Sequence, residues 1–338
     1  LRKRIDSFNN IKLSKEDRFA FQKKCYFLPN MYFDFLEGFR LDPSEVSIYQ
    51  EKNGKLKIKI EGYWYRTILW EVILMSEISE INYLMTGEKI NYNSDVLSEY
   101  NCKKSTRMHY SNTFFADFGT RRRFSFENQN KVIKDLKSEK SFIGTSNVLF
   151  AIKYDIKIIG TFAHEVVSAV ASVLGYEHAN KNMMELWSKT FNGELGISLT
   201  DTFGLDSFLN DFNSKYARLF DGVRHDSGDP FLFTDEIVKH YKKLNIDPMS
   251  KTIVFSDGLN IDKAIEIKEY CKNKIKCSFG IGTHLTNDLK GIKPLNMVIK
   301  LFKIDGKNVI KLSDNKGKHT GDEKTINLVK QLINYKPL

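Results

Sequence analysis

Short apolar runs that end in polar, glycine-rich turns recur along the chain from about residue 112. The runs are rich in β-branched and aromatic residues, and helix-like segments follow most of them, for example DKAIEIKEYCKNK at 262–274. The seven segments are FFADFGTRRR, SFIGTSN, IIGTFAHE, GISLTDTF, GVRHDSGDP, TIVFSDGLN and CSFGIGTHLTND. A strand, a polar turn and a helix in repeated order predict parallel βα units.

The first 110 residues and the last fifty follow other patterns. Apolar positions at 68, 69, 72, 73, 78 and 81 form a helical stripe, and KLKIKI at 55–60 alternates as a half-exposed strand does. Near the C-terminus, two β-prone runs flank Asp305 and Gly306, which predicts a hairpin. We expect this hairpin to pack against the first 110 residues.

The turns that follow the strands would gather on one face of a (β/α) barrel, or along one edge of an open doubly wound sheet. A packed core alone does not explain why the runs end in Asp, Arg, His, Thr or Asn. The expected fold is α/β, an irregular (β/α) barrel with a second, smaller α/β domain. We place the N-terminal α/β domain at 1–111, joined by the C-terminal hairpin at about 290–338, and the barrel at 112–289.

Composition narrows the class of protein. The 338 residues are 41% hydrophobic and 28% charged, which is ordinary for a water-soluble chain of one large or two intimate domains. No apolar run is long enough to span a bilayer, so we expect no membrane partner. The four cysteines show no CxxC spacing, which predicts free thiols and a cytoplasmic location. The chain starts at Leu1 without a methionine, and we expect its true amino terminus to lie upstream.

The net charge of +10 raises the question of nucleic acid. The lysines are scattered among asparagines and isoleucines, as in KNGKLKIKI, and no zinc finger or RNA-binding motif accompanies them. A solvated basic surface explains the charge best, and attraction of a small anionic substrate comes next. We therefore expect no nucleic-acid partner.

Several familiar motifs are excluded. GIGTHL at 280–285 lacks the third glycine of a dinucleotide fingerprint, and there is no Walker A sequence. His164 and Glu165 are not followed by the second histidine of a zinc-protease helix, and no GxSxG elbow occurs.

What remains are parts that suit an anion. The turns GTSN at 144–147, SDGLN at 256–260 and GIGT at 280–283 expose backbone N–H groups that can bind phosphate. Each alone is also an ordinary turn, so the argument rests on their coincidence at successive strand ends. Carboxylates could bind sugar hydroxyls or Mg²⁺, and arginines could pair with phosphate or carboxylate. These residues are Asp201, Asp226, Asp229, Asp257, Arg121, Arg122, Arg123 and Arg224. A phosphorylated sugar together with a flat anion would satisfy them all.

In this order, DFGTRRRFS, GTSNV, GTFAHE, GVRHDSGDP, VFSDGLN, SFGIGTHLTND, VIKL and KLSD resemble the nicotinate phosphoribosyltransferase family, a group of type II phosphoribosyltransferases. The resemblance implies that nicotinate and 5-phosphoribosyl 1-pyrophosphate react to give nicotinate mononucleotide and pyrophosphate, with ATP hydrolysis coupled to the step and Mg²⁺ present. It also implies a homodimer whose active sites are shared between subunits.

The resemblance assigns roles residue by residue. Arg224 is expected to meet the nicotinate carboxylate, Asp226 to lie by the ribose or its Mg²⁺, and His164 to be phosphorylated by ATP. With Asp201 these make the expected catalytic set, and Mg²⁺ is expected near Asp226 and Asp229. The expected substrate-binding residues are Phe118, Arg121, Thr145, Ser146, Arg224, Ser227, Asp257, Gly258, Gly282 and Thr283. Phe118 would stack on the pyridine, whereas Gly258, Gly282 and Thr283 would bind the 5′-phosphate through their N–H groups.

Ser146 separates two substrates. Relatives that use nicotinamide carry Asp at this position, and a carboxylate there would be repelled by nicotinate. Nicotinate is the expected substrate, with nicotinamide as the alternative. A non-catalytic barrel that binds phosphoribosyl pyrophosphate is the other alternative, and the intact AHE and DSGD segments argue against it. The sequence departs from the family in one respect, since the Asp-x-Tyr-Lys motif, whose tyrosine stacks on nicotinate across the dimer, does not occur in it.

Overall fold

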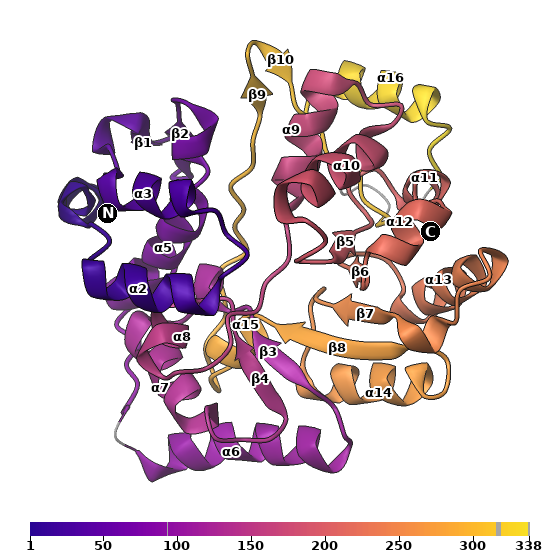
Figure 1. Cartoon of the computed structure of the whole chain (residues 1–338). Coiled ribbons are helices and arrows are strands. Elements are labelled where there is room, and N and C mark those ends of the chain that lie inside the picture. The colour runs from indigo at the N-terminus through magenta and orange to yellow at the C-terminus, as the bar shows by residue number, and fades with distance from the viewer. Residues whose placement is uncertain (93, 316–318, 337–338) are drawn as a thin grey trace.

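A parallel sheet lies at the centre of the computed structural model, which describes residues 1–92, 94–315 and 319–336 (Figure 1). Within these residues the sheet has six strands in the order β4-β3-β8-β7-β6-β5, and every neighbouring pair is parallel. The strands are β3 (Phe115–Asp117), β4 (Phe142–Thr145), β5 (Ile197–Leu199), β6 (Gly222–His225), β7 (Thr252–Phe255) and β8 (Lys276–Ile281). The α/β class is confirmed. In the described ranges, the two edge strands β4 and β5 are not hydrogen-bonded to each other. The barrel is therefore irregular, because its sheet does not close.

Six of the seven expected strands form, and the seventh, in IIGTFAHE, is reduced to a single bridge between Thr145 and Ile158. Two backbone hydrogen bonds make this bridge, from Thr145 N to Lys157 O and from Ile159 N to Thr145 O. Beyond it the chain leaves the sheet through Gly160 and reaches a helix, α9 (His164–Leu174). Helix α9 therefore begins at His164.

Helices pack against the sheet, and Figure 1 shows α14 below β8 and α6 below β4. The helices of this region are α6 (Asp95–Tyr110), α7 (Phe126–Leu136), α8 (Val148–Lys153), α10 (Ala179–Phe191), α11 (Leu205–Asp211), α12 (Ser214–Leu219), α13 (Pro230–Lys243), α14 (Ile261–Cys271) and α15 (Thr283–Thr286). The largest hydrophobic cluster joins strand residues such as Phe115, Ile253 and Phe279 to the apolar faces of these helices. Gly222 permits the close approach of β6 to β7, because a Cβ there would clash with the carbonyl oxygen of Thr252.

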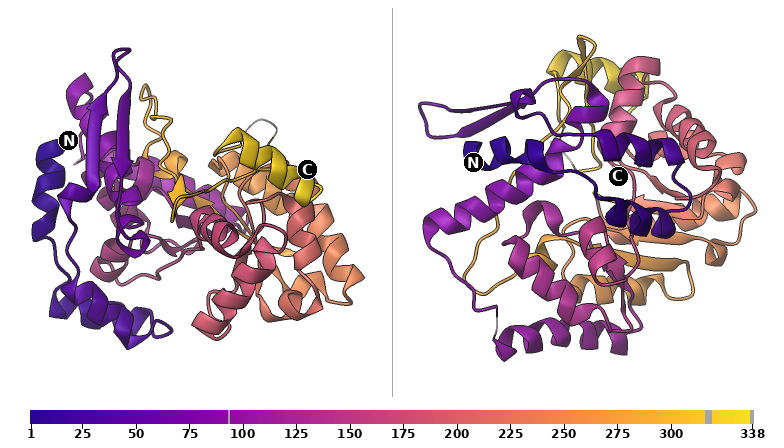
Figure 2. Two further views of the ribbon diagram at one scale, coloured as in Figure 1. Left: turned by 90° about the horizontal axis from the view of Figure 1, so that it is seen from above. Right: turned by 60° about the vertical axis from the view of Figure 1, so that its left-hand side comes forward.

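The N-terminal region forms a separate cluster around Ile5, Val46, Trp70 and Leu74. KLKIKI forms a strand as predicted, and it pairs antiparallel with an earlier strand in the register Val46 to Ile60. In both views of Figure 2 this hairpin projects away from the rest of the chain. The elements are α1 (Arg2–Ser7), α2 (Lys15–Lys24), α3 (Asn30–Gly38), β1 (Val46–Gln50), β2 (Leu56–Ile60), α4 (Trp64–Thr67) and α5 (Trp70–Thr86).

The C-terminal hairpin forms where the sequence predicted it. Strands β9 (Lys303–Ile304) and β10 (Lys307–Asn308) pair antiparallel, and the turn residues Asp305 and Gly306 have φ of 47° and 75°. Positive φ at both positions is the geometry of a type I′ turn.

The packing of the C-terminal segment differs from the expectation. Ile299, before the hairpin, packs against the N-terminal cluster. The residues after it, including Ile310 and Leu312, instead form a third cluster with Val167 and Ala171 of α9. They do so because the apolar face of α9 needs a cover, which the end of the chain and α16 (Glu323–Leu332) provide. The domain limits drawn from the sequence remain a prediction. In the described part of the chain, no helix has the length and apolarity needed to cross a bilayer.

Candidate active site

The turn after β6 lies among the carboxyl ends of the other strands, since all strand pairs in the sheet are parallel. Gly228 takes a φ of 87° within this turn, a conformation that favours glycine. Asp229 ends the turn and begins α13, where its Oδ1 accepts hydrogen bonds from the backbone N–H groups of Phe231 (2.8 Å) and Leu232 (2.9 Å). The carboxylate of Asp229 therefore caps a helix, and this role accounts for its position.

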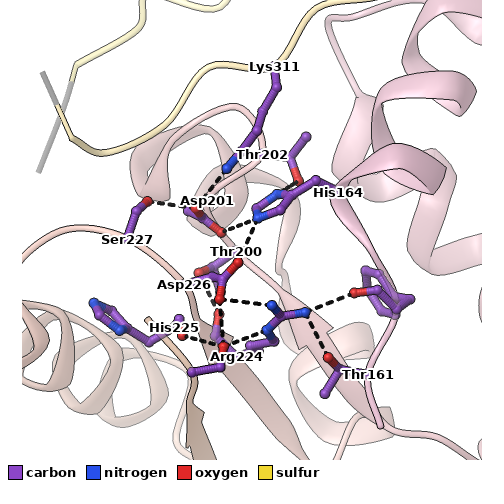
Figure 3. A network of polar contacts seen from close by, with 12 residues as sticks. Thr161, His164, Thr200, Asp201, Thr202, Arg224, His225, Asp226, Ser227 and Lys311 are labelled. Atoms are coloured by element: carbon purple, nitrogen blue, oxygen red, sulfur yellow. Dashed lines mark hydrogen bonds and ion pairs between the residues drawn. The ribbon is translucent and has the colours of Figure 1, made fainter. Parts of the chain in front are cut away.

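Arg224 and Asp226 project from this turn and its strand into one cluster (Figure 3). The Nη2 atom of Arg224 lies 2.8 Å from Oδ1 of Asp226. Ser256, at the end of β7, connects the same two residues, because its hydroxyl accepts from Nε of Arg224 (2.7 Å) and donates to Oδ1 of Asp226 (2.6 Å). Nη1 of Arg224 donates to Thr161 Oγ1 (2.8 Å) and Phe162 O (3.2 Å) in the segment before α9. The arginine thus joins three segments of the chain at one point.

His164 faces this cluster from the first turn of α9. Its Nε2 lies 3.0 Å from Oδ2 of Asp226 and 3.5 Å from Oδ1 of Asp201, and its Nδ1 lies 2.9 Å from Thr202 Oγ1. The expected catalytic residues His164, Asp201 and Asp226 are therefore brought together.

The protonation of the cluster follows from the charge around Asp226. Burial alone would raise its pKa, but Arg224 and the hydrogen bonds from His164 and Ser256 hold the pKa well below its ordinary value of 3.8. An ionised carboxylate can only accept. A neutral His164 must therefore donate its Nε2–H to Asp226, which leaves the lone pair on Nδ1, where the Thr202 hydroxyl donates.

Asp201, next to His164, is only 1% exposed. Its Oδ2 accepts from the hydroxyl of Ser227 (2.6 Å) and lies 3.5 Å from Nζ of Lys311. Its Oδ1 has no hydrogen-bond partner of normal geometry among the described residues. The side chain of Ser227 is buried against Asp201 and orients that carboxylate, and its expected contact with substrate stays a prediction.

A second set of polar residues organises the turns after β3 and β4. Asp117 is completely buried, and it accepts hydrogen bonds from Gly119 N (2.7 Å), Gln129 Nε2 (2.8 Å) and Thr145 Oγ1 (2.7 Å). Burial raises the pKa of Asp117, and these three hydrogen bonds oppose that shift. Thr145 was expected to contact substrate, but it too is fully buried, and its hydroxyl is committed to Asp117. The hydroxyl of Thr145 thus holds two turns together, and its contact with substrate stays a prediction.

Phe118 and Ser146 are the groups that these two turns present. The ring of Phe118 lies against Gly280 of β8, where a Cβ would collide with the ring edge, so a glycine at 280 leaves room for the aromatic side chain. Ser146 is exposed, and its backbone N–H donates to Asp117 O (2.8 Å). Phe118 is half-buried and Ser146 is exposed, and their contacts with substrate stay a prediction.

The remaining predicted residues follow neighbouring strands. Arg121 lies in the short helix η3 (Thr120–Arg122), is half-exposed, and has its Nη1 3.2 Å from Oε1 of Glu71. Asp257 and Gly258 form an exposed turn after β7, with a φ of 57° at Gly258. Gly282 precedes the one-turn helix α15, which begins at Thr283.

Comparison with known proteins identifies the family. The model of the nicotinate phosphoribosyltransferase (NAPRTase) family matches residues 113–336, and the model of its N-terminal domain matches residues 1–79. The chain belongs to the nicotinate phosphoribosyltransferase family. Among its relatives, the nicotinate phosphoribosyltransferase of Desulforapulum autotrophicum is 49% identical over 95% of this chain and 84% of its own length. That of Methanosarcina mazei is 41% identical over 100% of this chain and 88% of its own.

Solved structures of the family have the same fold. The nicotinate phosphoribosyltransferase of Porphyromonas gingivalis superposes with a TM-score of 0.95 at 39% identity, covering 99% of this chain and 88% of its own. A putative nicotinate phosphoribosyltransferase from Saccharomyces cerevisiae gives a TM-score of 0.92 at 37% identity over 98% of this chain and 86% of its own. The family recognised in the sequence motifs is confirmed.

Sequence reasoning on this family member missed several residues of the cluster. Ser256, Thr161, Thr202 and Lys311 all contact the expected residues. They lie in the motif segments SDGLN, GTFAHE, GISLTDTF and KLSD. The segments were therefore the right ones, but hydroxyl groups in turns and single lysines are too common to be chosen without knowing what they face.

Proposed function

We propose that the chain joins nicotinate to 5-phosphoribosyl 1-pyrophosphate, giving nicotinate mononucleotide and pyrophosphate, and that ATP drives the step through phosphorylation of His164. The observation that carries the proposal is the contact of His164 with Asp226, which in turn pairs with Arg224. Nucleophile, carboxylate and cation meet at the carboxyl ends of the sheet strands, where α/β enzymes bind their substrates.

In the transfer step, the pyridine nitrogen of nicotinate attacks C1 of the ribose while the bond from C1 to the pyrophosphate oxygen breaks. The electrons of that bond leave with pyrophosphate, and positive charge develops on the sugar. The ionised carboxylate of Asp226 would stabilise this charge. Arg224 would exchange part of its present contacts for the carboxylate of nicotinate, and Phe118 would support the ring.

In the coupling step, Nδ1 of His164 attacks the γ-phosphorus of ATP, the bond to the bridging oxygen breaks, and ADP leaves. The Nε2–H bond to Asp226 supports this role, since the imidazole gains positive charge as the new bond forms. The helix N-terminus at His164 also favours added negative charge. Hydrolysis of the phosphohistidine would complete the cycle.

A magnesium ion fits this donor set. No group of three His, Cys, Asp or Glu residues in the described ranges could hold a metal unaided, but Mg²⁺ is commonly held by one or two carboxylates together with substrate phosphates. Asp201, whose buried Oδ1 lacks a normal hydrogen-bond donor, and Asp226 would supply those carboxylates. When bound, Mg²⁺ would neutralise the departing pyrophosphate. Asp229 is the weaker candidate because it caps α13.

We further propose a cytoplasmic homodimer with shared active sites. All four cysteines are free, which agrees with a reducing compartment. Large apolar side chains of the N-terminal helices and the segment between them are exposed, notably Phe19, Tyr26 and Met31. Such side chains support the burial of this region against a second copy.

The test of the proposed function is labelling from γ-labelled ATP. We expect an acid-labile, base-stable label on the wild-type protein and none on His164→Ala, with slow, ATP-independent formation of nicotinate mononucleotide retained in the variant. The ribosyl chemistry survives because it does not use the histidine. A label that persists in His164→Ala would contradict the assignment, and turnover of nicotinamide in place of nicotinate would favour the alternative substrate.

A further inference from the structure

The first turn of α9 is held at two successive residues by different parts of the chain. His164 contacts the turns after β5 and β6 through Thr202 and Asp226. Glu165, the next residue, reaches in another direction, and its Oε1 accepts a hydrogen bond of 2.7 Å from Nε1 of Trp64. Trp64 begins α4 in the N-terminal region. One side of this turn therefore belongs to the site, and the other side is attached to the N-terminal helices.

The hydrogen bond between Trp64 and Glu165 lies in partly desolvated surroundings. Both side chains are half-buried. Burial raises the pKa of Glu165 and the nearby Glu71 adds to the shift, whereas the indole N–H lowers it. A hydrogen bond to a carboxylate in such a place contributes more than the same bond in water.

Arg224 also holds the segment just before this turn, at Thr161 and Phe162, so Trp64 is one of several restraints on the start of α9. The N-cap residue is Ala163, and no side chain of the described residues makes a capping bond there. The buried apolar contacts of α9 are those of Val167 and Ala171, and Val166 packs beside them. These contacts hold the axis of the helix, and the hydrogen bond from Trp64 to Glu165 acts on its first turn.

A second contact from the same region reaches the other side of the site. Glu71, in the first turn of α5, accepts from Arg121 of η3 at 3.2 Å. The short helix η3 follows β3, whereas His164 of α9 contacts Asp201 and Thr202 after β5. Strands β3 and β5 are well separated in the sheet. The segment from α4 to α5 therefore contacts both of these distant parts of the sheet.

We propose that Trp64 is a positioning residue for His164: by holding Glu165, its indole N–H keeps the first turn of α9 oriented so that the imidazole faces Asp226 and presents Nδ1 to the phosphoryl donor. The inference rests on the proposed function, because it concerns the rate at which His164 is phosphorylated. Trp64 would thus affect the coupling step, while ribosyl transfer, which does not use the histidine, would not depend on it.

The test compares two activities of the same variants. In Trp64→Phe, which keeps an aromatic ring and removes the N–H, we expect the rate of His164 labelling from ATP to fall roughly tenfold. ATP-independent formation of nicotinate mononucleotide should stay at the wild-type rate. Glu165→Ala should reproduce the loss, and Glu165→Gln, which keeps an acceptor oxygen, should retain most of the labelling rate. In the double variant Trp64→Phe/Glu165→Ala, labelling of His164 should be no slower than in either single variant, because both changes remove the same hydrogen bond.

Trp70→Phe is the matched control. Its Nε1 donates to Oε2 of Glu45 at 2.9 Å, so the change removes an indole-to-glutamate hydrogen bond from the same region without touching α9. Labelling of folded Trp70→Phe should match wild type. The inference is overturned if Trp64→Phe is labelled at the wild-type rate, if both activities fall equally, or if Trp70→Phe loses as much. Absence of label on the wild-type protein would instead refute the proposed function, and this inference with it. If Trp64→Phe fails to fold, Glu165→Ala and Glu165→Gln decide the question.

Discussion

Asp117 and Asp226 both lie at the carboxyl ends of parallel strands, but their surroundings and their roles differ. Asp117 is completely buried, and its partners are the neutral donors of Gly119, Gln129 and Thr145. Asp226 has a side chain 20% exposed, and its partners include the cation of Arg224 and the titratable ring of His164. A carboxylate surrounded by neutral donors fixes local geometry. One that faces solvent among charged groups can exchange partners with a substrate.

The largest expected effect comes from removing the buried carboxylate. Asp117→Ala leaves three buried donors without an acceptor, and each costs about 1–3 kcal/mol, so the free energy of unfolding should drop by at least about 3 kcal/mol. Urea unfolding measures this loss. Asp226→Ala is the comparison, and we expect a smaller loss of stability because water can reach its partners, together with loss of activity. If Asp226→Ala were the less stable of the two, the contrast between the two regions would be wrong.

The sequence predicted the repeated strand ends well because short-range patterns determine them. Alternating and β-branched runs became β3 to β8, and the glycine turns after them carry the expected residues. It did not predict which groups each side chain in these turns would contact. Thr145 and Ser227 lie in the right turns, but their hydroxyls point to Asp117 and Asp201 instead of outward.

Contacts between segments that are distant in the chain could not be predicted from the sequence either. Nothing local in Trp64 indicates that it bonds to a residue about one hundred positions later. Likewise, the run around Ile158 has strand-like composition, but only one bridge to Thr145 forms before the chain turns toward α9. Such outcomes are decided by tertiary packing, which local propensity does not contain.

The next effect is on substrate affinity. Arg224→Ala removes the cation expected to meet the carboxylate of nicotinate, and a charge-assisted hydrogen bond contributes about 1.5–3 kcal/mol. We therefore expect the KM for nicotinate to rise by roughly 10- to 150-fold, with a much smaller change for phosphoribosyl pyrophosphate. Steady-state kinetics with each substrate varied in turn measures both constants. Arg218→Ala, which removes an arginine from α12, serves as the control. Equal losses for both substrates would mean that Arg224 serves the phosphates instead.

The smallest effect is the pH dependence of stability, which should have opposite signs in the two regions. The folded pKa of Asp226 is lowered, so its contribution is present above the ordinary value of 3.8 and is lost as pH falls through the lower folded value. The folded pKa of Asp117 is raised by burial, so its contribution is fully present below 3.8 and is lost as pH rises through the higher folded value. Asp226→Asn should therefore cost more stability at neutral pH than in acid, whereas Asp117→Asn should cost more in acid than at neutral pH. Urea midpoints of both variants and wild type, measured across this range, give the two slopes. If the stability cost of both substitutions changed with pH in the same direction, the contrast between a buried Asp117 and a charge-paired Asp226 would be wrong.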